Sequence, residues 1–401
     1  MPHDALFSAV GRCISQETPE LLAFRRDLHA HPELAFQETR TTDALAVRLD
    51  QASIPTRRLA RTGLLADIGA PDASYRVALR ADMDALPVRE RTGLPFASTT
   101  PGVCHACGHD VHTAALLGAL LALKSVETDL IRAGVAIRGI FQPAEEVIPG
   151  GAHDAIAADA MEGVDSVFAI HCDPSLDVGQ VGLREGPITA ACDQITVSLH
   201  GRGGHTSRPQ LTEDLTYALA KMITDVPAAL SRRLDPRAGA ALVWGVVNAG
   251  KAANVIPSSG EASGTLRMLD AHAWLTVGPL LEEIVQGVAA PYAVQAKLER
   301  VKGVPPVVNT PDGIAACRAA AGPTHLETVP TQQSLGGEDF SWYLSHAPGA
   351  MVRLGTRTPG GHTFDLHQGD LVVDEEAVRL GALFLANVAL CAWHGSTEAT
   401  L

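Results

Sequence analysis

The sequence predicts an α/β protein of two domains, in which a larger domain built on a mostly parallel sheet is interrupted by a smaller α+β domain. The first observation behind this prediction is the length of 401 residues, which exceeds the size at which a single hydrophobic core usually stops growing. The second is a change of pattern along the chain. Apolar strand patterns alternate with helix patterns towards both ends, whereas the middle alternates polar and apolar residues, as half-exposed antiparallel strands do.

The first part of the larger domain is expected over residues 1–188. Residues 17–52 are predicted to form two helices, which the stretch "HPELAFQE" separates. The elements that follow are the strands "GLLADIG" and "RVALRAD", the helix "HTAALLGALLALKSV", and the buried strands "AGVAIRGIFQ" and "GVDSVFAIHC". This alternation of strands and helices predicts a mostly parallel sheet that is covered on both faces.

The inserted α+β domain is expected over residues 189–302. The period of two in "DQITVSLHGRGGHTS" and "GEASGTLRMLD" predicts antiparallel strands, and "EDLTYALAKMITDVPAAL" and "AWLTVGPLLEEIVQGVAA" are predicted to be helices on one face of them. Residues 303–401 are expected to complete the larger domain, with "GAMVRLG" as a strand and "EEAVRLGALFLANVALCAW" as a closing helix.

Composition argues against several classes of function. The net charge of −14 repels phosphate backbones, so no nucleic-acid partner is expected. No run approaches the roughly 18 apolar residues of a membrane span, and the N-terminus lacks the basic and apolar regions of a signal peptide. The seven cysteines form no regular framework, which predicts reduced thiols and a cytoplasmic location.

The stretch "GVCHACGHDVHTAA", residues 102–115, gathers three histidines, two cysteines and an aspartate within nine positions. A structural zinc site needs a second close pair of ligands, and the chain has no second C-x-x-C to partner Cys104 and Cys107. A redox C-x-x-C needs no histidines, and ordinary loop histidines are rarely so dense. The stretch therefore favours a catalytic metal site, with the structural zinc and redox interpretations as weaker alternatives.

Further ligands for such a site must come from elsewhere in the chain, and one position must stay open. Cys107 and His109 are two residues apart, and the glycine between them lets the loop turn tightly enough for both to face one point. Acidic and imidazole side chains at predicted strand ends and near the C-terminus are further candidates: Glu145, Glu146, His171 and His367. Strand ends are where open α/β sheets gather their ligand sites.

Seven motifs occur in order from about residue 22 to residue 390: "HPELAFQE", "LRADMDALPV", "HACGHDVHTAALLGA", "FQPAEE", "GGHTSRP", "NVIP" and "GGEDFSWYL". Together they resemble the metal-dependent amidohydrolases of the aminoacylase/carboxypeptidase family of metallopeptidases. The similar branch holds hippurate hydrolases, N-acyl-amino-acid amidohydrolases and indoleacetyl-amino-acid hydrolases. The resemblance implies hydrolysis of the amide bond of an N-acyl amino acid. A metal-dependent dipeptidase or carboxypeptidase is the alternative, and a redox or non-catalytic binding protein is a weaker one.

The resemblance also implies the parts of the site. Two divalent ions per subunit, of zinc, manganese, cobalt or nickel, are expected to hold the attacking water, with Glu145 as general acid and base. The implied metal ligands are Cys107, His109, Glu146, His171 and His367. The side chains expected to hold these ligands in place are Asp82, Asp84, Asp110 and His112, although the last two could simply cap the following helix.

Three residues of the inserted domain are assigned roles by the same resemblance. His205 is expected to stabilise the carbonyl oxygen in the active site of the neighbouring subunit of a homodimer formed through this domain. Asn254 and Arg267 suit a clamp for the substrate carboxylate, although a surface ion pair explains Arg267 equally well.

Two stretches depart from the family pattern. The usual glycine run after the Glu-Glu pair is "VIPGGA" here, and the C-terminal Leu-His is followed by Gln-Gly in "LHQGDLVVDEE" instead of Ser-Pro or Asn-Pro. His362 is therefore the alternative to His367 as a ligand.

Overall fold

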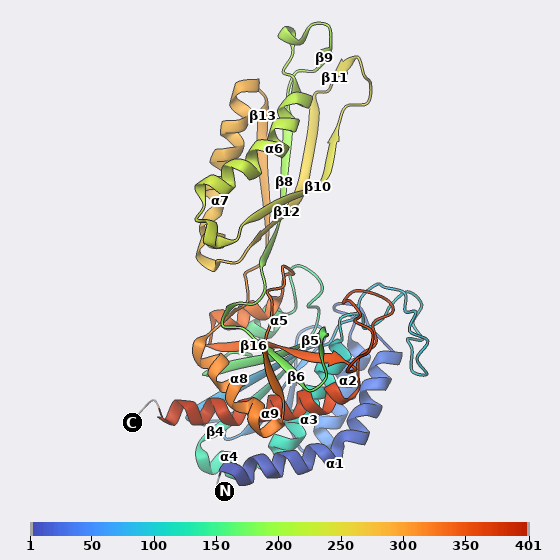
Figure 1. Cartoon of the computed structure of the whole chain (residues 1–401), viewed down its shortest axis with the longest axis vertical. Coiled ribbons are helices and arrows are strands. Elements are labelled where there is room, and N and C mark those ends of the chain that lie inside the picture. The colour runs from blue at the N-terminus through green and yellow to red at the C-terminus, as the bar shows by residue number, and fades with distance from the viewer. Residues whose placement is uncertain (1–2, 399–401) are drawn as a thin grey trace. The chain divides into compact units, whose positions relative to one another are not determined.

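The computed structural model describes residues 3–398 of the chain, which divide into two compact units (Figure 1). The first unit comprises Met1–Ile188, Val308–Gln332 and Asp339–Leu401. The second comprises Thr189–Val307 and Gln333–Glu338. The chain therefore crosses from one unit to the other four times, and each unit is described by itself below.

The first unit is built on an eight-stranded sheet with the strand order β1-β2-β4-β3-β5-β16-β6-β15. Its strands are β1 Thr56–Arg58, β2 Leu64–Gly69, β3 Tyr75–Asp82, β4 Val135–Gln142, β5 Ser166–Asp177, β6 Gln180–Leu183, β15 Glu327–Pro330 and β16 Gly349–Arg357. The four central strands β4, β3, β5 and β16 are mutually parallel, whereas β2 and β6 run antiparallel to their central neighbours. Every residue of β4 is buried, as expected of a strand covered on both faces. The structure thus confirms the predicted fold class.

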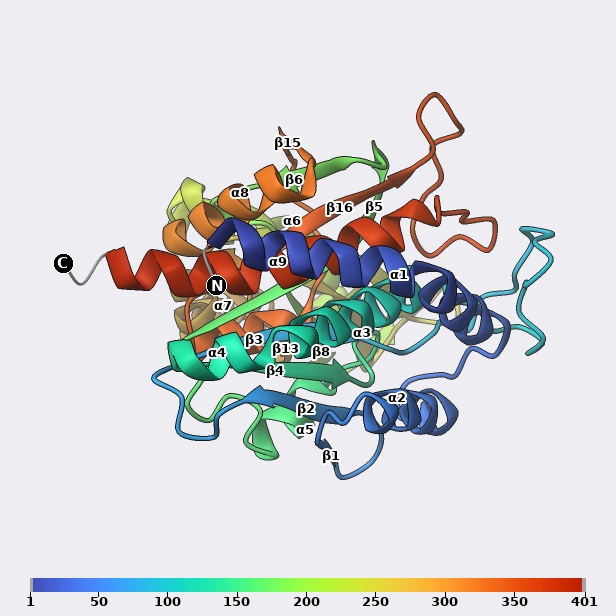
Figure 2. The same cartoon turned by 90° about the horizontal axis from the view of Figure 1, so that it is seen from below.

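Three long helices form most of the cover of this sheet. α3 His109–Ser125 and α9 Glu376–Glu398 pack on one face, α1 His3–Ala30 packs on both of them, and Figure 2 shows the three side by side. α5 Ala152–Ala157 contacts β4 and lies on the opposite side of the sheet (Figure 1). The remaining elements of the unit are α2 Thr39–Gln51, α4 Glu127–Ala133, α8 Pro311–Thr324, the 3-10 helix η4 Asp339–Ser345, and the two-stranded pair β7 Gly186–Pro187 with β14 Val308–Asn309.

Two elements differ from their predicted bounds. α1 begins at His3, well before the predicted start at residue 17, because Leu6, Val10 and Ile14 continue its buried stripe at a spacing of four. β5 does not end at His171 but continues to Asp177, because it keeps pairing with β16 beyond that residue. His171 is therefore an interior residue of its strand.

Within residues 3–398, one helix has the length and apolar composition that could cross a membrane. Its window is Glu376–Trp393 of α9, and 83% of that window is buried inside the protein. α9 is therefore a core helix, and its apolar character is explained by packing against α1, α3 and α8.

The second unit is a four-stranded antiparallel sheet in the order β10-β12-β8-β13 with two helices. Its main elements are β8 Ala191–His200, β10 Ala241–Ala249, β12 Ser259–Met268, β13 Gln295–Val304, α6 Leu215–Arg233 and α7 Ala271–Ala289. A two-stranded ladder, β9 Gly204–His205 with β11 Val255–Ile256, and the 3-10 turns η1 Pro209–Leu211, η2 Pro236–Ala238 and η3 Ala290–Tyr292 complete it. Alternate residues of β8 are buried, which is the predicted period of two.

Gly118 allows α1, α3 and α9 to approach closely. A Cβ atom at this position would lie 2.6 Å from Cδ1 of Leu21 and 2.9 Å from Cβ of Ala382. We expect Gly118→Ala to lower the free energy of unfolding by about 1–3 kcal/mol because the core would be overpacked. Gly11→Ala is the matched control, since a Cβ there meets nothing within 4 Å. This substitution should raise the free energy of unfolding by about 0.5–1 kcal/mol through helix propensity. Denaturant unfolding of both variants tests this, and a Gly118→Ala protein as stable as Gly11→Ala would contradict it.

Candidate metal centre

The loop that precedes α3 places Cys107 and His109 at the carboxyl end of the parallel strands. Gly108 between them is the N-cap of α3 and has a φ of 81°, a left-handed conformation that favours glycine. A Cβ at Gly108 would also lie 2.8 Å from Sγ of Cys172 on β5. Both the backbone conformation and the close approach to β5 therefore require glycine at the centre of the motif.

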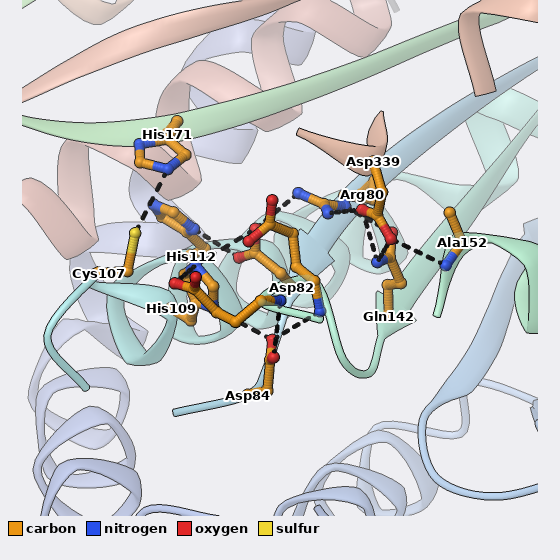
Figure 3. Close-up of polar contacts among 12 residues, drawn as sticks. Arg80, Asp82, Asp84, Cys107, His109, His112, Gln142, Ala152, His171 and Asp339 are labelled. Carbon is orange, nitrogen blue, oxygen red and sulfur yellow. Dashed lines mark hydrogen bonds and ion pairs between the residues drawn. The ribbon is translucent and has the colours of Figure 1, made fainter. Parts of the chain in front are cut away.

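The structure brings together all five residues that the sequence analysis proposed as ligands. Sγ of Cys107 lies 3.6 Å from Nε2 of His171, and Figure 3 shows both beside His109. Oε1 of Glu146 lies 3.3 Å from Nε2 of His367 and 3.8 Å from Nε2 of His109. Three of the groups whose ligand atoms lie within 4.8 Å of one another contain these residues and overlap: Cys107–His109–His171, Cys107–Glu146–His367 and His109–Glu145–Glu146.

Several donor atoms of this cluster are buried without a hydrogen bond. Within the described residues, the two ring nitrogens of His109 and Oε1 of Glu146 make no hydrogen bond. Buried polar atoms normally have a hydrogen-bond partner. His171 is oriented by Nδ1–H, which donates to the carbonyl oxygen of Cys172 at 2.8 Å, so Nε2 faces Cys107. Thiolate, imidazole and carboxylate donors with unsatisfied atoms facing one another fit a pair of divalent metal ions.

The charges of the cluster shift the pKa values of its histidines. The adjacent Cys107 thiol and Glu146 carboxylate raise the pKa of His367 to about 10. Burial alone would lower the pKa of His109, but the charges of Asp82 and Cys107 outweigh it and raise the pKa. Burial and the nearby Arg353 lower the pKa of His171. Protons therefore compete with metal ions for at least two of the donors, so metal binding should release protons.

Asp84 links the two ligand-bearing segments. Its Oδ1 and Oδ2 accept hydrogen bonds from the backbone N–H groups of Glu145 and Glu146, both at 3.0 Å. Oδ1 also lies 3.3 Å from Nδ1 of His109. One carboxylate thus sets the turn after β4 and the orientation of a histidine on α3.

Asp82 and His112 connect the end of β3 to β5 through hydrogen bonds beside the centre. Nδ1–H of His112 donates to Oδ1 of Asp82 at 2.6 Å, and Nε2 accepts from the backbone N–H of Cys172 at 2.8 Å. Because both ring nitrogens are engaged, His112 is suited to hold β5 in place and not to bind a metal ion. Asp82 in turn accepts from Nη1 of Arg80 at 2.6 Å.

Sequence reasoning missed the buried network that extends from Arg80 (Figure 3). Nη2 of Arg80 donates to Asp339 at 2.9 Å, and Nε donates to Gln142 at 2.9 Å. Asp339 also accepts from the amide of Gln142 and from the backbone N–H of Ala152. The signal was present in the motifs "FQPAEE" and "GGEDFSWYL", which contain Gln142 and Asp339.

The other predicted site residues lie outside this cluster. The carboxylate of Asp110 pairs with Nε of Arg25 at 2.7 Å and with Nδ1 of His29 at 2.9 Å. The alternative ligand His362 packs its ring on Phe364. Within the described residues, no group of possible ligands includes Cys104.

The second unit carries the three remaining candidates, and they do not all lie together. His205 pairs with Val255 in the β9–β11 ladder, and the carbonyl oxygen of Asn254 accepts from the backbone N–H of Thr206, so His205 and Asn254 are neighbours. Arg267 lies near the opposite end of β12, roughly 25 Å away along the strand, where its guanidinium donates to the carbonyl oxygen of Leu335.

Comparison with known proteins relates the chain to hydrolases. The sequence pattern of peptidase family M20/M25/M40 matches residues 78–390. The chain is 36% identical over 372 residues to N-acetylcysteine deacetylase of Bacillus subtilis, covering 92% of this chain and 96% of that one. It is 36% identical over 379 residues to thermostable carboxypeptidase 1 of Saccharolobus solfataricus, covering 92% and 94%.

A third relative is longer than this chain. The chain is 48% identical over 364 residues to a protein of Rhodococcus jostii that carries the name glutamate–cysteine ligase 2-3, which covers 90% of this chain but only 45% of that protein. Among solved structures, the Bacillus subtilis YxeP protein, described as a dinuclear metal-binding peptidase of the M20 family, superposes with a TM-score of 0.81 at 33% identity, covering 94% and 98% of the two chains.

Asp84→Asn should weaken metal binding about 10- to 100-fold, the usual effect of losing a group that orients ligands. The amide has a single acceptor oxygen. Its NH2 group would therefore face one of the two backbone N–H groups that now donate hydrogen bonds to Asp84, and two donors would oppose each other. Competition against a chelator would measure the affinity, with Asp43→Asn as control, because Asp43 forms an exposed ion pair with Arg58. Equal affinities in the two variants would show that Asp84 does not orient the ligands.

Proposed function

Because the chain belongs to peptidase family M20/M25/M40, it is a metal-dependent hydrolase of amide bonds, and we propose that its substrates are small N-acyl amino acids. The observation that carries the proposal is Glu145, a half-buried carboxylate placed within 4.8 Å of the donor atoms of His109 and Glu146. The name of the Bacillus subtilis relative supports the substrate class and makes N-acetyl-L-cysteine the first substrate to test.

The proposed metal site uses the five clustered donors. Cys107, His109, Glu146, His171 and His367 would hold two divalent ions, for which thiolate and imidazole donors suit zinc but do not exclude manganese, cobalt or nickel. When bound, such ions lower the pKa of a water molecule and polarise the substrate carbonyl. Asp82, Asp84 and His112 would keep the donors in place through the hydrogen bonds described above.

Glu145 is proposed as the proton carrier of the reaction. Its carboxylate would take a proton from the attacking water and deliver it to the leaving amine. Its backbone N–H donates to Asp84, so the position of the side chain is set by the same contact that sets Glu146. Proton carrier and ligand would therefore keep a fixed spacing.

We also propose that the protein is a cytoplasmic homodimer formed through the second unit. β10 is an edge strand that exposes Val243, Val246 and Val247, and exposed apolar edges are usually paired or covered. His205 would serve the active site of the other subunit, and Asn254 and Arg267 would bind the carboxylate of the substrate. All seven cysteines are free thiols, which supports a reducing compartment.

A carboxypeptidase or dipeptidase activity is the alternative, and the name of the Saccharolobus solfataricus relative favours it. Both activities use the same donors and the same proton carrier. They differ in the group that contributes the carbonyl of the cleaved bond, which is a simple acyl chain in one case and an aminoacyl or peptidyl group in the other.

A substrate comparison with metal-reconstituted protein tests the proposed function. We expect hydrolysis of N-acetyl, benzoyl or indoleacetyl amino acids to exceed that of dipeptides. We also expect removal of metal by a chelator to abolish this hydrolysis until a divalent ion is restored.

Substitution of the proposed proton carrier tests the mechanism. Glu145→Gln should retain metal, as shown by elemental analysis, but lose about 10²- to 10⁴-fold in kcat. Full activity in metal-free protein, or in Glu145→Gln, would refute the mechanism, and a preference for dipeptides would favour the alternative.

Mixing of two inactive variants tests the composite site. His205→Ala should lower turnover about 10²- to 10³-fold, the usual effect of removing one donor to the carbonyl oxygen, without loss of metal. When His205→Ala and Glu145→Gln subunits exchange, one site of each heterodimer regains both intact residues, so activity should reappear. If activity stays absent although subunit exchange is shown by differently tagged chains, His205 does not serve the neighbouring site.

A further inference from the structure

A surface pocket of about 590 Å³ is lined by Val88, Arg89, Glu90, Arg91, Gln368 and Gly369. It belongs to the first unit, and two of its lining residues follow His367 directly. Consecutive Cα atoms are about 3.8 Å apart, so Gln368 and Gly369 are within reach of the proposed ligand. The segment that carries His367 therefore joins the pocket to the proposed metal centre.

Backbone contacts join the walls of this pocket. The N–H of Arg91 donates to the carbonyl oxygen of Gly369 at 2.5 Å, and a Cβ at Gly369 would lie 2.0 Å from the carbonyl oxygen of Arg89. The N–H of His367 donates to the carbonyl oxygen of Ala106 at 2.7 Å. Residues 88–91, 367–369 and the loop before Cys107 are therefore held as one assembly.

The two arginines of the pocket are unpaired within residues 3–398. Arg89 and Arg91 are exposed, and neither guanidinium makes an ion pair or hydrogen bond with the described side chains and backbone groups. Glu90 between them does not neutralise them, because its side chain is 7% exposed and faces inward. Its carboxylate accepts from Nε2 of His29 at 3.2 Å, from the backbone N–H of Ser98 at 2.6 Å and from the hydroxyl of Thr92.

We infer that this pocket binds a second carboxylate of the substrate, in addition to the carboxylate of the amino acid, through Arg89 and Arg91. Guanidinium groups bind carboxylates through paired, charge-assisted hydrogen bonds. A local pair of uncompensated cations in a chain of net charge −14 marks a place where an anion is favoured. The inference rests on the proposed function and narrows its substrate class to dicarboxylic N-acyl amino acids.

The second carboxylate could sit on the acyl chain or on the amino-acid side chain, and two matched substrate pairs distinguish these sources. N-succinyl-L-methionine and N-butyryl-L-methionine differ in a carboxylate on the acyl chain. N-acetyl-L-glutamate and N-acetyl-L-glutamine differ in a carboxylate on the side chain. For each pair the measured quantity is the ratio of kcat/KM for the anionic member to that for the neutral member.

In the wild type we expect at least one of the two ratios to exceed unity. That ratio should fall when ionic strength rises from about 0.01 M to about 1 M, because the screening length shrinks from about 30 Å to about 3 Å.

The double variant Arg89→Gln/Arg91→Gln should lower that ratio about 5- to 20-fold, as expected of two charge-assisted hydrogen bonds at a partly exposed site. A fall in the methionine pair assigns the pocket to the acyl chain, and a fall in the glutamate pair assigns it to the side chain.

Arg318→Gln is the control, because Arg318 is an exposed arginine on α8 and should leave both ratios unchanged. The inference is overturned if neither wild-type ratio exceeds unity, or if the double variant changes the anionic and neutral members equally. In those cases hydrolysis of the neutral N-acyl substrates would still uphold the proposed function. Absence of hydrolysis of all four substrates by metal-loaded wild type would refute the inference together with the N-acyl amino acid proposal.

Discussion

The buried carboxylate of Asp84 accepts hydrogen bonds from two consecutive backbone N–H groups, and the geometry of the whole centre depends on this contact. Those N–H groups belong to Glu145 and Glu146, and the same carboxylate lies beside His109. A buried charge is costly unless it is paired and hydrogen-bonded, and here the backbone of the adjacent strand end supplies the donors. The proposed proton carrier and two proposed ligands are therefore placed relative to one side chain on the segment after β3.

A second buried charge extends this arrangement to the far end of the sequence. Arg80 is 1% exposed and pairs with Asp82 and Asp339, and Gln142 joins the guanidinium to Asp339. Buried ion pairs contribute more to a unique arrangement than to stability in some systems. In this protein the network holds the ends of β3 and β4 against η4, so the strand ends that carry the donors cannot shift independently.

The sequence allowed prediction of the fold class, the family and the five clustered donors, because each depends on local pattern. Period and apolar runs reveal strands and helices, and the spacing of Cys107 and His109 reveals a shared loop. Partners distant in sequence were not predictable in this way. Nothing local to Asp110 shows that it faces Arg25 and His29, and nothing local to Arg80 shows that it meets residue 339.

The end of β5, the strand that carries His171, and the start of α1 show the same distinction. The end of β5 depends on how far β16 continues to pair with it, which is a property of two segments about 180 residues apart. The roles of the five donors, of Glu145 and of the second-unit residues stay predictions, although the donors lie together as a common metal centre requires.

The interleaved order of the two units has a consequence for how the protein is made. β5 is complete at residue 177, but its parallel neighbour β16 begins at residue 349, after the second unit has been synthesised. During translation the edge of β5 that carries His171 therefore stays unpaired while residues 189–307 emerge, and unpaired edges of that kind invite association with other chains. The main elements of the antiparallel second unit are contiguous from β8 to β13, so they can pair with one another before the sheet that bears the metal donors closes.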